Sequence, residues 1–257
     1  MTPGPLHILL TGAASGLGRG LALYFAEKGH HLVLADKNAE GLRETVGLLG
    51  TAAERTSTHV LDVTAAGQVR DLVAALGGRP VELLINDAGL QHVARLEDFP
   101  EERWDVLVDV LLKGPFLLAQ AVLPGMRMAG FGRVVTIGSI HSLVASPFKS
   151  AYVAAKHGLL GFSKVLALEA ADADITVNTV CPSYIRTPLV DAQIAAQARA
   201  HGMSEQEVIA RIMLEPMPKK QFITVEEVAA AIEFLAGHAA RNITGQTIVI
   251  DGGWTAR

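Results

Sequence analysis

Short apolar segments that favour β-strands alternate with longer amphipathic segments along most of this chain. Strands are predicted at His7–Thr11, His31–Asp36, Thr58–Val63, Leu83–Asn86, Arg133–Ile137, Ile175–Val180 and Thr247–Ile250. Helices are predicted at Leu17–Lys28, Ala39–Leu49, Ala65–Leu76, Glu101–Met128, Ser150–Ala171 and Val225–Gly237. Because the strands are continuous apolar runs, both faces of the sheet are expected to be covered, as in parallel sheets. The alternation predicts an α/β fold with a doubly wound parallel sheet of about seven strands.

Length and charge narrow the classes of protein further. A chain of 257 residues fits one α/β domain spanning residues 1–257. Its one irregular part, Arg186–Phe222, follows a strand end and is expected to form a helical lid over a substrate.

The net charge of −4 favours neither nucleic acid nor an anionic membrane as a partner. The lone Cys181 excludes an internal disulfide framework, and the histidines show no ligand spacing, so no metal site is expected.

Two further features point to a cytoplasmic protein. The segment Met1–Pro5 lacks the basic start and apolar run of a signal peptide. The most apolar stretch, Trp104–Met128, is interrupted by charged residues and by Gly114–Pro115, so a membrane span is not expected.

A glycine-rich segment, Thr11–Gly18, joins the first predicted strand to the first predicted helix. This context turns a glycine pattern into a phosphate-binding site, although the spacing Gly-x-x-x-Gly-x-Gly differs from the commoner Gly-x-Gly-x-x-Gly. We expect Gly12 to permit a tight turn, Gly16 to let the backbone approach a pyrophosphate, and Gly18 to allow close packing of the helix on the sheet. The sequence therefore predicts a dinucleotide at this loop.

Asp36 ends the second predicted strand, about 20 residues after the glycine loop. A carboxylate there can accept hydrogen bonds from both ribose hydroxyls of adenosine and would repel a 2′-phosphate. Lys37 is the adjacent cation, and Ala13 and Ala14 offer no second one. The cofactor is therefore expected to be NAD rather than NADP.

Tyr152 and Lys156 are four residues apart on a predicted helix, so their side chains share one face. A free phenol titrates near pH ~10, and a neighbouring ammonium favours the phenolate. We expect Lys156 to lower the pKa of Tyr152 towards the range useful for acid–base catalysis. A tyrosine and a lysine at this spacing are also a common surface pair, so the motif gains its meaning from the residues around it.

Several further segments carry a family resemblance: the Thr11–Gly18 loop, Asp36, Asp62–Val63, Asn86–Gly89, Ser139, Tyr152, Lys156 and Cys181–Ser183. Over essentially its whole length the chain resembles the short-chain dehydrogenases/reductases, which share a single-domain Rossmann fold. The resemblance implies three catalytic residues, Ser139, Tyr152 and Lys156. It also implies cofactor contacts from Gly12, Ser15, Gly16, Leu17, Gly18, Asp36, Asp62, Val63, Asn86, Ala88, Gly89, Tyr152, Lys156, Pro182, Ile185 and Thr187.

The same resemblance implies individual roles for these residues. Asp62 would meet the adenine ring, Asn86–Gly89 would lie beneath the cofactor, and Thr187 would lie near the nicotinamide carboxamide. Ser139 would bind the substrate oxygen while Tyr152 passes the proton. The family is commonly tetrameric, so a homotetramer is expected.

Longer segments resemble the bacterial members of this family that oxidise D-3-hydroxybutyrate: Ala88–Val93, Ser139–His141, Leu143–Ser146, Lys149–Gly158 and Asp251–Arg257. That resemblance implies a small hydroxy acid substrate. It implies substrate contacts from Gln91, Ser139, His141, Lys149, Tyr152, Tyr184 and Gln193, with the carboxylate held by Gln91, His141, Lys149 and Gln193. A cation and donors are what a carboxylate needs in a partly dry pocket.

Each of these polar residues has an ordinary alternative. Lys149 fits a solvated surface lysine, His141 a helix cap, and Gln91 and Gln193 glutamines without a special role. The function has alternatives as well. These are the dehydrogenation of another small hydroxy acid or a sugar, the reduction of 3-oxoacyl groups on a carrier protein, and NAD binding by a sensor without catalysis.

Two positions depart from the family pattern. Leu111 stands where the family has an asparagine that helps hold a water linking the lysine to solvent, and leucine has no hydrogen-bonding group. Either the proton leaves by another water route at a reduced rate, which we favour, or the helix geometry differs and Asp109 substitutes. Tyr184 stands where the hydroxybutyrate enzymes carry tryptophan. The hydroxyl that tyrosine adds to this aromatic wall would shift the preference for substrate chain length.

Overall fold

The computed structural model describes residues 4–256, so Met1–Pro3 and the terminal Arg257 of the Asp251–Arg257 segment lie outside it. The chain forms a seven-stranded sheet in the order β3-β2-β1-β4-β5-β6-β7. Every strand pair is parallel. The strands are β1 (His7–Thr11), β2 (His31–Asp36), β3 (Thr56–Val60), β4 (Leu83–Asn86), β5 (Phe131–Ile137), β6 (Asp174–Pro182) and β7 (Thr247–Ile250). The predicted doubly wound parallel sheet is confirmed.

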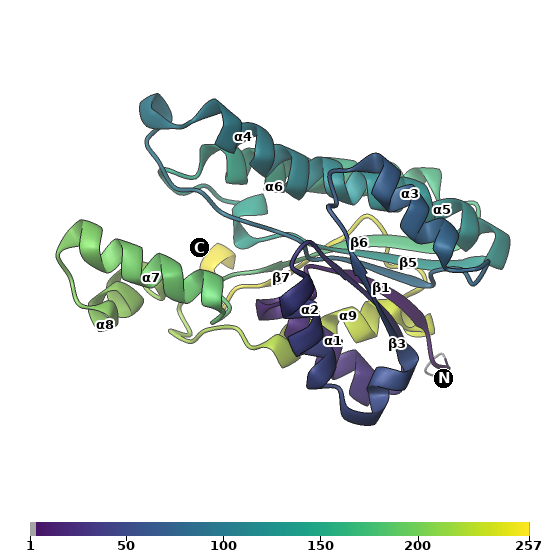
Figure 1. Ribbon diagram of the computed structural model, residues 1–257. Coiled ribbons are helices and arrows are strands. Elements are labelled where there is room, and N and C mark those ends of the chain that lie inside the picture. The colour runs from purple at the N-terminus through teal and green to yellow at the C-terminus, as the bar shows by residue number, and fades with distance from the viewer. Residues whose placement is uncertain (1–3, 257) are drawn as a thin grey trace.

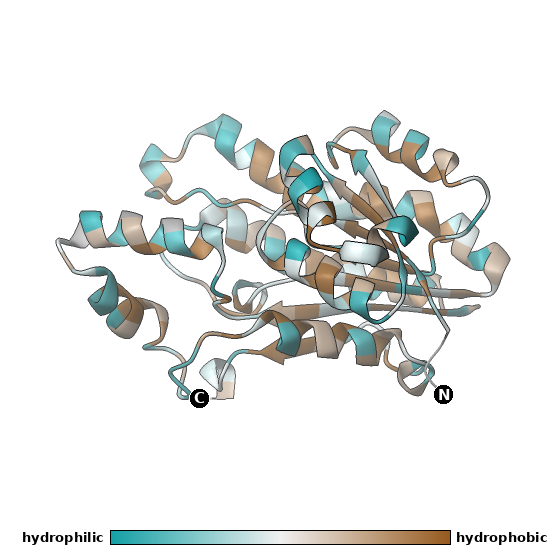
Figure 2. Ribbon diagram, turned by 60° about the horizontal axis from the view of Figure 1, so that its bottom comes forward, coloured by the Kyte–Doolittle hydropathy of each residue, from teal (hydrophilic) through white to brown (hydrophobic). Residues whose placement is uncertain are grey.

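Helices cover both faces of this sheet (Figure 1). On one face lie α1 (Gly16–Glu27), α2 (Ala39–Gly47) and α9 (Val225–Ala236). On the other lie α3 (Ala66–Ala75), α4 (Glu101–Val108), α5 (Gly114–Ala129) and α6 (Ser150–Glu169). Each face has its own apolar core between strands and helices. In Figure 2 the apolar residues accordingly gather along the strands and on the inward sides of the helices.

β3 is displaced from its prediction, since it spans Thr56–Val60 rather than Thr58–Val63. Its residues pair with Leu32–Asp36 of β2, and its other edge is free within the sheet. An edge strand needs less apolar character than a central one, and most of β3 is exposed or half-buried. Leu61 and Val63 suggested the wrong bounds because they are buried just beyond the strand.

The predicted single helix from Glu101 to Met128 is instead α4 and α5 joined by a π-helical turn, Asp109–Lys113. The helical run Glu101–Ala129 is the one described helix long and apolar enough to cross a membrane by length and composition alone. Its best window has a mean hydropathy of 1.8 and is 39% buried. The expectation that charged residues and Gly114–Pro115 interrupt the apolar run too much for a span is thus wrong by this measure of length and composition. Both halves pack within the fold, α5 on β5 and α4 on α6.

The winding of the sheet reverses between the adjacent strands β1 and β4, because the connections that leave their carboxyl ends run to opposite faces of the sheet. Such a switch point opens a crevice for a ligand in doubly wound folds. Beyond β6, residues 186–222 form α7 (Pro188–His201), α8 (Glu205–Val208) and a π-helical turn, Ile209–Met213. These helices project away from the carboxyl edge of the sheet (Figure 1). They hold a small apolar cluster of their own, with Val190, Ile194, Val208 and Met213 buried.

Candidate active site

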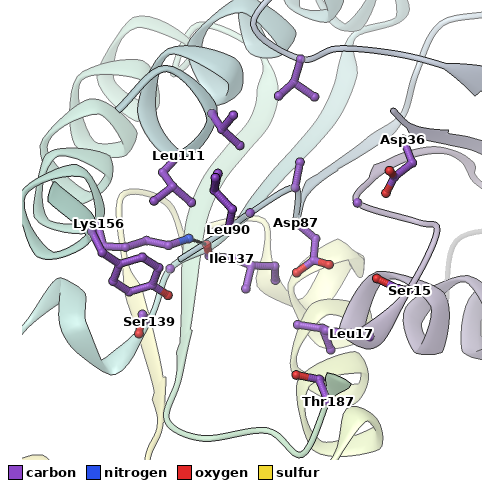
Figure 3. Close-up of a pocket in the computed structure, with 18 of the residues that line it drawn as sticks. Ser15, Leu17, Asp36, Asp87, Leu90, Leu111, Ile137, Ser139, Lys156 and Thr187 are labelled. Carbon is purple, nitrogen blue, oxygen red and sulfur yellow. Dashed lines mark hydrogen bonds between the residues drawn. The ribbon is translucent and has the colours of Figure 1, made fainter. Parts of the chain in front are cut away.

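A cavity of about 410 Å³ runs along the carboxyl edge of the sheet at this switch point. Asp36 lies at one end of it and Ser139 and Lys156 at the other, with Asp87 between them (Figure 3). Most of the residues expected to bind the cofactor line it: Gly12, Ser15, Gly16, Leu17, Asp36, Asp62, Val63, Ala88, Gly89, Tyr152, Lys156, Pro182, Ile185 and Thr187. The cavity thus joins segments spread over most of the chain.

The glycine loop makes its turn where side chains do not fit. Gly12 has φ +73°, and a Cβ there would lie 2.9 Å from the backbone nitrogen of Ala88. A Cβ on Gly18 would lie 2.2 Å from the carbonyl oxygen of Gly12, so α1 packs closely on the loop. Gly16 lines the cavity at φ +54°, whereas Gly18 is not among the described lining residues. The loop therefore presents backbone to the cavity at the start of α1, which suits a phosphate group.

Two carboxylates lie at the Asp36 end of the cavity, which is expected to receive adenosine and is named the adenosine end, and backbone amides fix both of them. Asp36 accepts hydrogen bonds from the amides of Ala14 at 3.1 Å and Asn38 at 2.9 Å. Asp62 accepts from the amide and hydroxyl of Thr64, and these bonds lower the pKa of its carboxyl. Both carboxylates are held facing the cavity before any ligand binds.

The segment Asn86–Gly89 starts with the last residue of β4, and its part Asp87–Gly89 forms the floor of the cavity. Thr11 fixes it, since its hydroxyl accepts from the amides of Asp87 and Ala88. Asn86, expected to contact the cofactor, is instead buried behind the floor, where its amide group donates to the hydroxyl of Thr136 at 3.3 Å. The reason is register, since Asn86 still belongs to β4 and pairs with Thr136 of β5. Its neighbour Asp87 faces the cavity in its place.

Ser139, Tyr152 and Lys156 come together as predicted, from the end of β5 and from α6. Ser139 hydrogen-bonds the phenol of Tyr152, and its Oγ also accepts from the amide of His141 at 3.1 Å. The Lys156 Nζ lies 5.8 Å from the centre of the Tyr152 ring and donates to the carbonyl of Ile137 at 2.6 Å.

The expected lowering of the Tyr152 pKa is wrong for the protein alone. Burial raises the pKa of Tyr152 to about 12, although the hydrogen bond with Ser139 acts in the opposite direction. Burial also lowers the pKa of Lys156 to about 8, with Asp87 opposing that change. The enclosure that brings the two groups together thus favours the neutral form of both. A phenolate here needs a further positive charge beside it.

Leu111 lies in the π-helical turn and is buried. It packs with Leu107, Ala151 and Ala155 in a small apolar cluster that also contacts Tyr152. The backbone geometry therefore does depart from a regular helix here. Asp109 lines the cavity, but its carboxylate pairs with Lys113 at 3.3 Å.

Beside Tyr152 lies a second group of side chains, which matches most of the expected substrate residues. The Lys149 side chain is buried, and its Nζ lies 5.6 Å from the centre of the Tyr184 ring. His141 is buried between the rings of Tyr152 and Trp254, each 6.1 Å away, and shares a 2.8 Å hydrogen bond with Ser146. Lys149 is thus not a solvated lysine. The Ser139 side chain caps the short turn that follows it by accepting from the backbone amide of His141, so the His141 ring does not act as the cap.

Burial sets the charge of this group. It lowers the pKa of Lys149 to about 8, and it lowers the pKa of His141 to about 3 with Lys149 acting in the same direction. At neutral pH the histidine is therefore neutral, whereas the lysine is still mostly protonated. The pair forms a buried cation beside a neutral hydrogen-bonding ring.

The two glutamines are not brought into this group by any contact in the described part of the chain. Gln91 is half-buried, and its carbonyl accepts from the amide of His92 at 3.1 Å, a local turn contact. Gln193 lies half-buried on α7, and neither glutamine is among the described cavity-lining residues. Their substrate roles stay predictions.

Sequence reasoning missed two residues of the site. Asp87 was part of the Asn86–Gly89 motif but had no role of its own. An acid directly after a buried strand, at the edge that carries the glycine loop, is the signal that identifies it. For Trp254 the sequence left a subunit contact and a place near the substrate equally open, and the structure places its ring 6.0 Å from that of Tyr184, in the group beside Tyr152.

Comparisons with known proteins agree with this geometry. A family model described as Enoyl-(Acyl carrier protein) reductase matches residues 12–255. The D-beta-hydroxybutyrate dehydrogenase of Rhizobium meliloti (strain 1021) is 43% identical over 253 residues, covering 97% of this chain and 98% of that protein. The enzyme of the same name from Cupriavidus necator is 39% identical over 254 residues and covers 97% of each chain.

A solved structure shares the whole fold. It is a phenylalanine-to-tryptophan variant of actinorhodin polyketide ketoreductase with NADPH, which superposes with a TM-score of 0.92 at 31% identity and covers 98% of each chain. The glycine turn, the fixed Asp36 carboxylate and the Tyr152–Lys156 pair on one cavity fit a nicotinamide dinucleotide. From the family match, the near full-length relatives and this arrangement, the chain belongs to the short-chain dehydrogenase/reductase family, whose members are oxidoreductases that use a nicotinamide cofactor.

Proposed function

We propose that this protein interconverts D-3-hydroxybutyrate and acetoacetate by hydride transfer with NAD. The observation that carries the proposal is the buried Lys149 beside Tyr184 and His141, next to Ser139 and Tyr152. A buried ammonium without a described carboxylate partner is costly, and the carboxylate of a small acid would offset that cost. The R. meliloti and C. necator relatives carry the name of this activity.

The choice of NAD over NADP depends on Asp36. Its carboxylate faces the cavity and is held by two backbone amides, so it can accept from ribose hydroxyls and would repel a 2′-phosphate. Lys37 also lines the cavity and acts in the opposite direction. We weigh the fixed carboxylate more heavily because Lys37 is exposed, and an exposed charge is well screened by water. The related ketoreductase, in contrast, was solved with NADPH.

The residues of this chain divide the reaction between them. Lys149, with His141 as a neutral donor or acceptor, would hold the carboxylate and so orient the 3-hydroxyl towards Ser139 and Tyr152. Ser139 would hydrogen-bond the reacting oxygen, and Tyr152 would take its proton. When bound, the dinucleotide supplies the hydride acceptor and a positive charge that favours the phenolate. Lys156 would stabilise that phenolate and hold the nicotinamide ribose.

The segment 186–222 would act as a lid over this substrate group within a single domain. Its helices α7 and α8 project from the same edge of the sheet as the cavity, and Val190 lines that cavity. Thr187 caps α7 through a hydrogen bond from the amide of Val190 at 3.4 Å, so the base of the segment is anchored at the site.

We further propose a cytoplasmic homotetramer. The α5 and α6 helices leave large apolar side chains exposed, among them Phe116, Met128, Val165 and Leu168, the last 80% accessible. Phe116 packs edge-to-face on Phe162 at 6.2 Å, so the two helices share this apolar face. A second copy of the chain would cover this face, since exposed apolar patches often mark contacts between proteins, and the contact would be one of the interfaces of the tetramer.

The test is the absorbance of NADH formed by purified protein from D-3-hydroxybutyrate, with NAD and NADP in parallel. We expect reduction of NAD, little reduction of NADP, and none with the L-isomer. Bound NADH with no turnover of this acid would contradict the proposed substrate. A panel of other hydroxy acids and 3-oxoacyl thioesters would then separate the remaining activities from a sensor that turns over nothing.

A further inference from the structure

Four acids line the described part of the cavity, and Asp87 is held differently from the others. Asp36 accepts from the backbone amides of Ala14 and Asn38, Asp62 accepts from the amide of Thr64, and Asp109 pairs with Lys113. Asp87 receives only the amide of Gly18, at the first turn of α1. Within residues 4–256 no lysine or arginine lies within ion-pair distance of it.

The position of Asp87 makes its lack of a cationic partner important for the binding of a ligand in the cavity. Its carboxyl points into the cavity midway between Asp36 and Lys156, level with the glycine loop (Figure 3). A ligand that reaches from Asp36 to Ser139 must pass over it. A dinucleotide carries its two phosphate charges in the middle, and the loop that would receive them is in contact with Asp87, since a Cβ on Gly18 would lie 2.9 Å from Asp87 Oδ2.

The titratable groups that face Asp87 are Lys156, Asp36 and Tyr152, and the backbone amide of Gly18 donates to it. Lys156 on α6 favours the ionised carboxyl, as does the Gly18 amide on α1, whereas Asp36 on β2 disfavours it. Tyr152 on α6 also couples to Asp87 and is neutral at physiological pH. Enclosure outweighs the two favourable contacts and raises the pKa of Asp87 to about 8.

We propose that Asp87 accommodates the dinucleotide only as a neutral carboxylic acid, so that binding takes up a proton wherever the free carboxyl is ionised, and that Asp87 acts as a positioning residue for the pyrophosphate. This rests on the proposed use of a nicotinamide dinucleotide. An ionised carboxylate under two phosphates in an enclosed cavity would repel them, whereas the protonated form keeps the Gly18 contact and adds a donor.

The sign of the pH dependence follows from linkage. A bound dianion raises the pKa of Asp87 further, so the bound state holds the proton to higher pH than the free state does. Affinity is then constant well below pH 8 and falls as pH rises above about 8, by up to tenfold per pH unit. An Asp87→Asn variant keeps the shape and the acceptor for Gly18 but carries no charge, so it isolates ionisation from packing.

The experiment is calorimetric titration of NADH into the protein between about pH 6 and pH 9, in two buffers of different ionisation enthalpy. We expect proton uptake that grows towards pH 8.5 and an affinity that falls, with both effects reduced in Asp87→Asn. Lys156 titrates in the same range, so infrared difference spectra supply the specific readout. NADH binding at pH 8.5 should produce the carbonyl band of a protonated carboxylic acid, absent in Asp87→Asn.

Asp62→Asn is the matched control, because hydrogen bonds from Thr64 keep Asp62 ionised across this range. It should leave proton uptake and the carboxylic acid band unchanged. NADH binding without proton uptake at pH 8.5, or a carboxylic acid band that persists in Asp87→Asn, overturns this inference and leaves the proposed function unaffected. Failure of both NADH and NADPH to bind at any pH would instead overturn the proposed function.

Discussion

The adenosine end of the cavity and the substrate end, which is the group of Lys149, His141 and Tyr184 beside Tyr152, are built on different principles. At the adenosine end, the amides of Ala14 and Asn38 satisfy Asp36 before any ligand arrives. At the substrate end, Lys149 is buried against an aromatic face, and burial lowers the pKa of its ammonium. The first end is therefore preorganised, whereas the second becomes fully satisfied only with an anion present. Cofactor binding should tolerate loss of substrate residues, and substrate recognition should be sensitive to a single charge.

The largest effect is expected where the two ends meet. Replacing Tyr152 by phenylalanine removes the proton acceptor but leaves both ends intact, so turnover should fall by about 10³-fold or more. NADH binding, followed by fluorescence, should change less than about twofold, since the lost hydroxyl contacts Ser139 rather than the glycine loop. A variant that retained substantial turnover would remove Tyr152 from its catalytic role.

The same contrast decides how much of the site could be predicted from the sequence. The adenosine end is encoded in short contiguous motifs, because a phosphate loop and a strand-end acid depend on local backbone geometry. The substrate end draws Lys149, Tyr184 and Trp254 from segments that only tertiary packing unites. Family resemblance supplied the first two, and nothing in the sequence located the third.

The fold shows a parallel limit. Central strands such as β1, β2 and β4 were predicted with their observed ends because they are buried on both faces. The polar edge strand β3 was not, since its residues lack that apolar signal. The periodicity did not reveal the π-helical turn at Leu111, because a single extra residue in a helix hardly disturbs the spacing of its apolar positions; only the departure of Leu111 from the family pattern pointed to a different helix geometry.

The next largest effect tests the substrate end alone. Lys149→Met keeps the length and apolar packing of the side chain but removes the charge. It should lower kcat/KM for D-3-hydroxybutyrate roughly 10- to 100-fold, the value of a charge-assisted hydrogen bond of about 1.5–3 kcal/mol. Oxidation of a secondary alcohol without a carboxylate serves as the control and should be unaffected. Equal losses on both substrates would show that Lys149 supports the site rather than the carboxylate.

A smaller effect is expected at the adenosine end. Asp36→Ala should shift the ratio of kcat/KM for NADP to that for NAD by at least about tenfold towards NADP, because a like-charge contact costs several kcal/mol. Lys37, already at the cavity, would then face the 2′-phosphate without a competing carboxylate. An Asp36→Ala,Lys37→Ala double variant should lose most of that gain in NADP use. An unchanged cofactor ratio in Asp36→Ala would place discrimination elsewhere on the cavity.

The smallest effect on turnover is expected at Leu111, which belongs to neither end. Leu111→Asn restores the family side chain, yet the Lys156 ammonium already donates to the Ile137 carbonyl, and the side chain of residue 111 packs among Leu107, Ala151 and Ala155. We therefore expect kcat to rise by less than about threefold, while the buried amide lowers the free energy of unfolding by about 1–3 kcal/mol. Thermal unfolding and kcat measured on one preparation separate the two effects. A tenfold rise in kcat would show that proton exit past Leu111 limits the enzyme, and that its apolar packing is kept at the expense of rate.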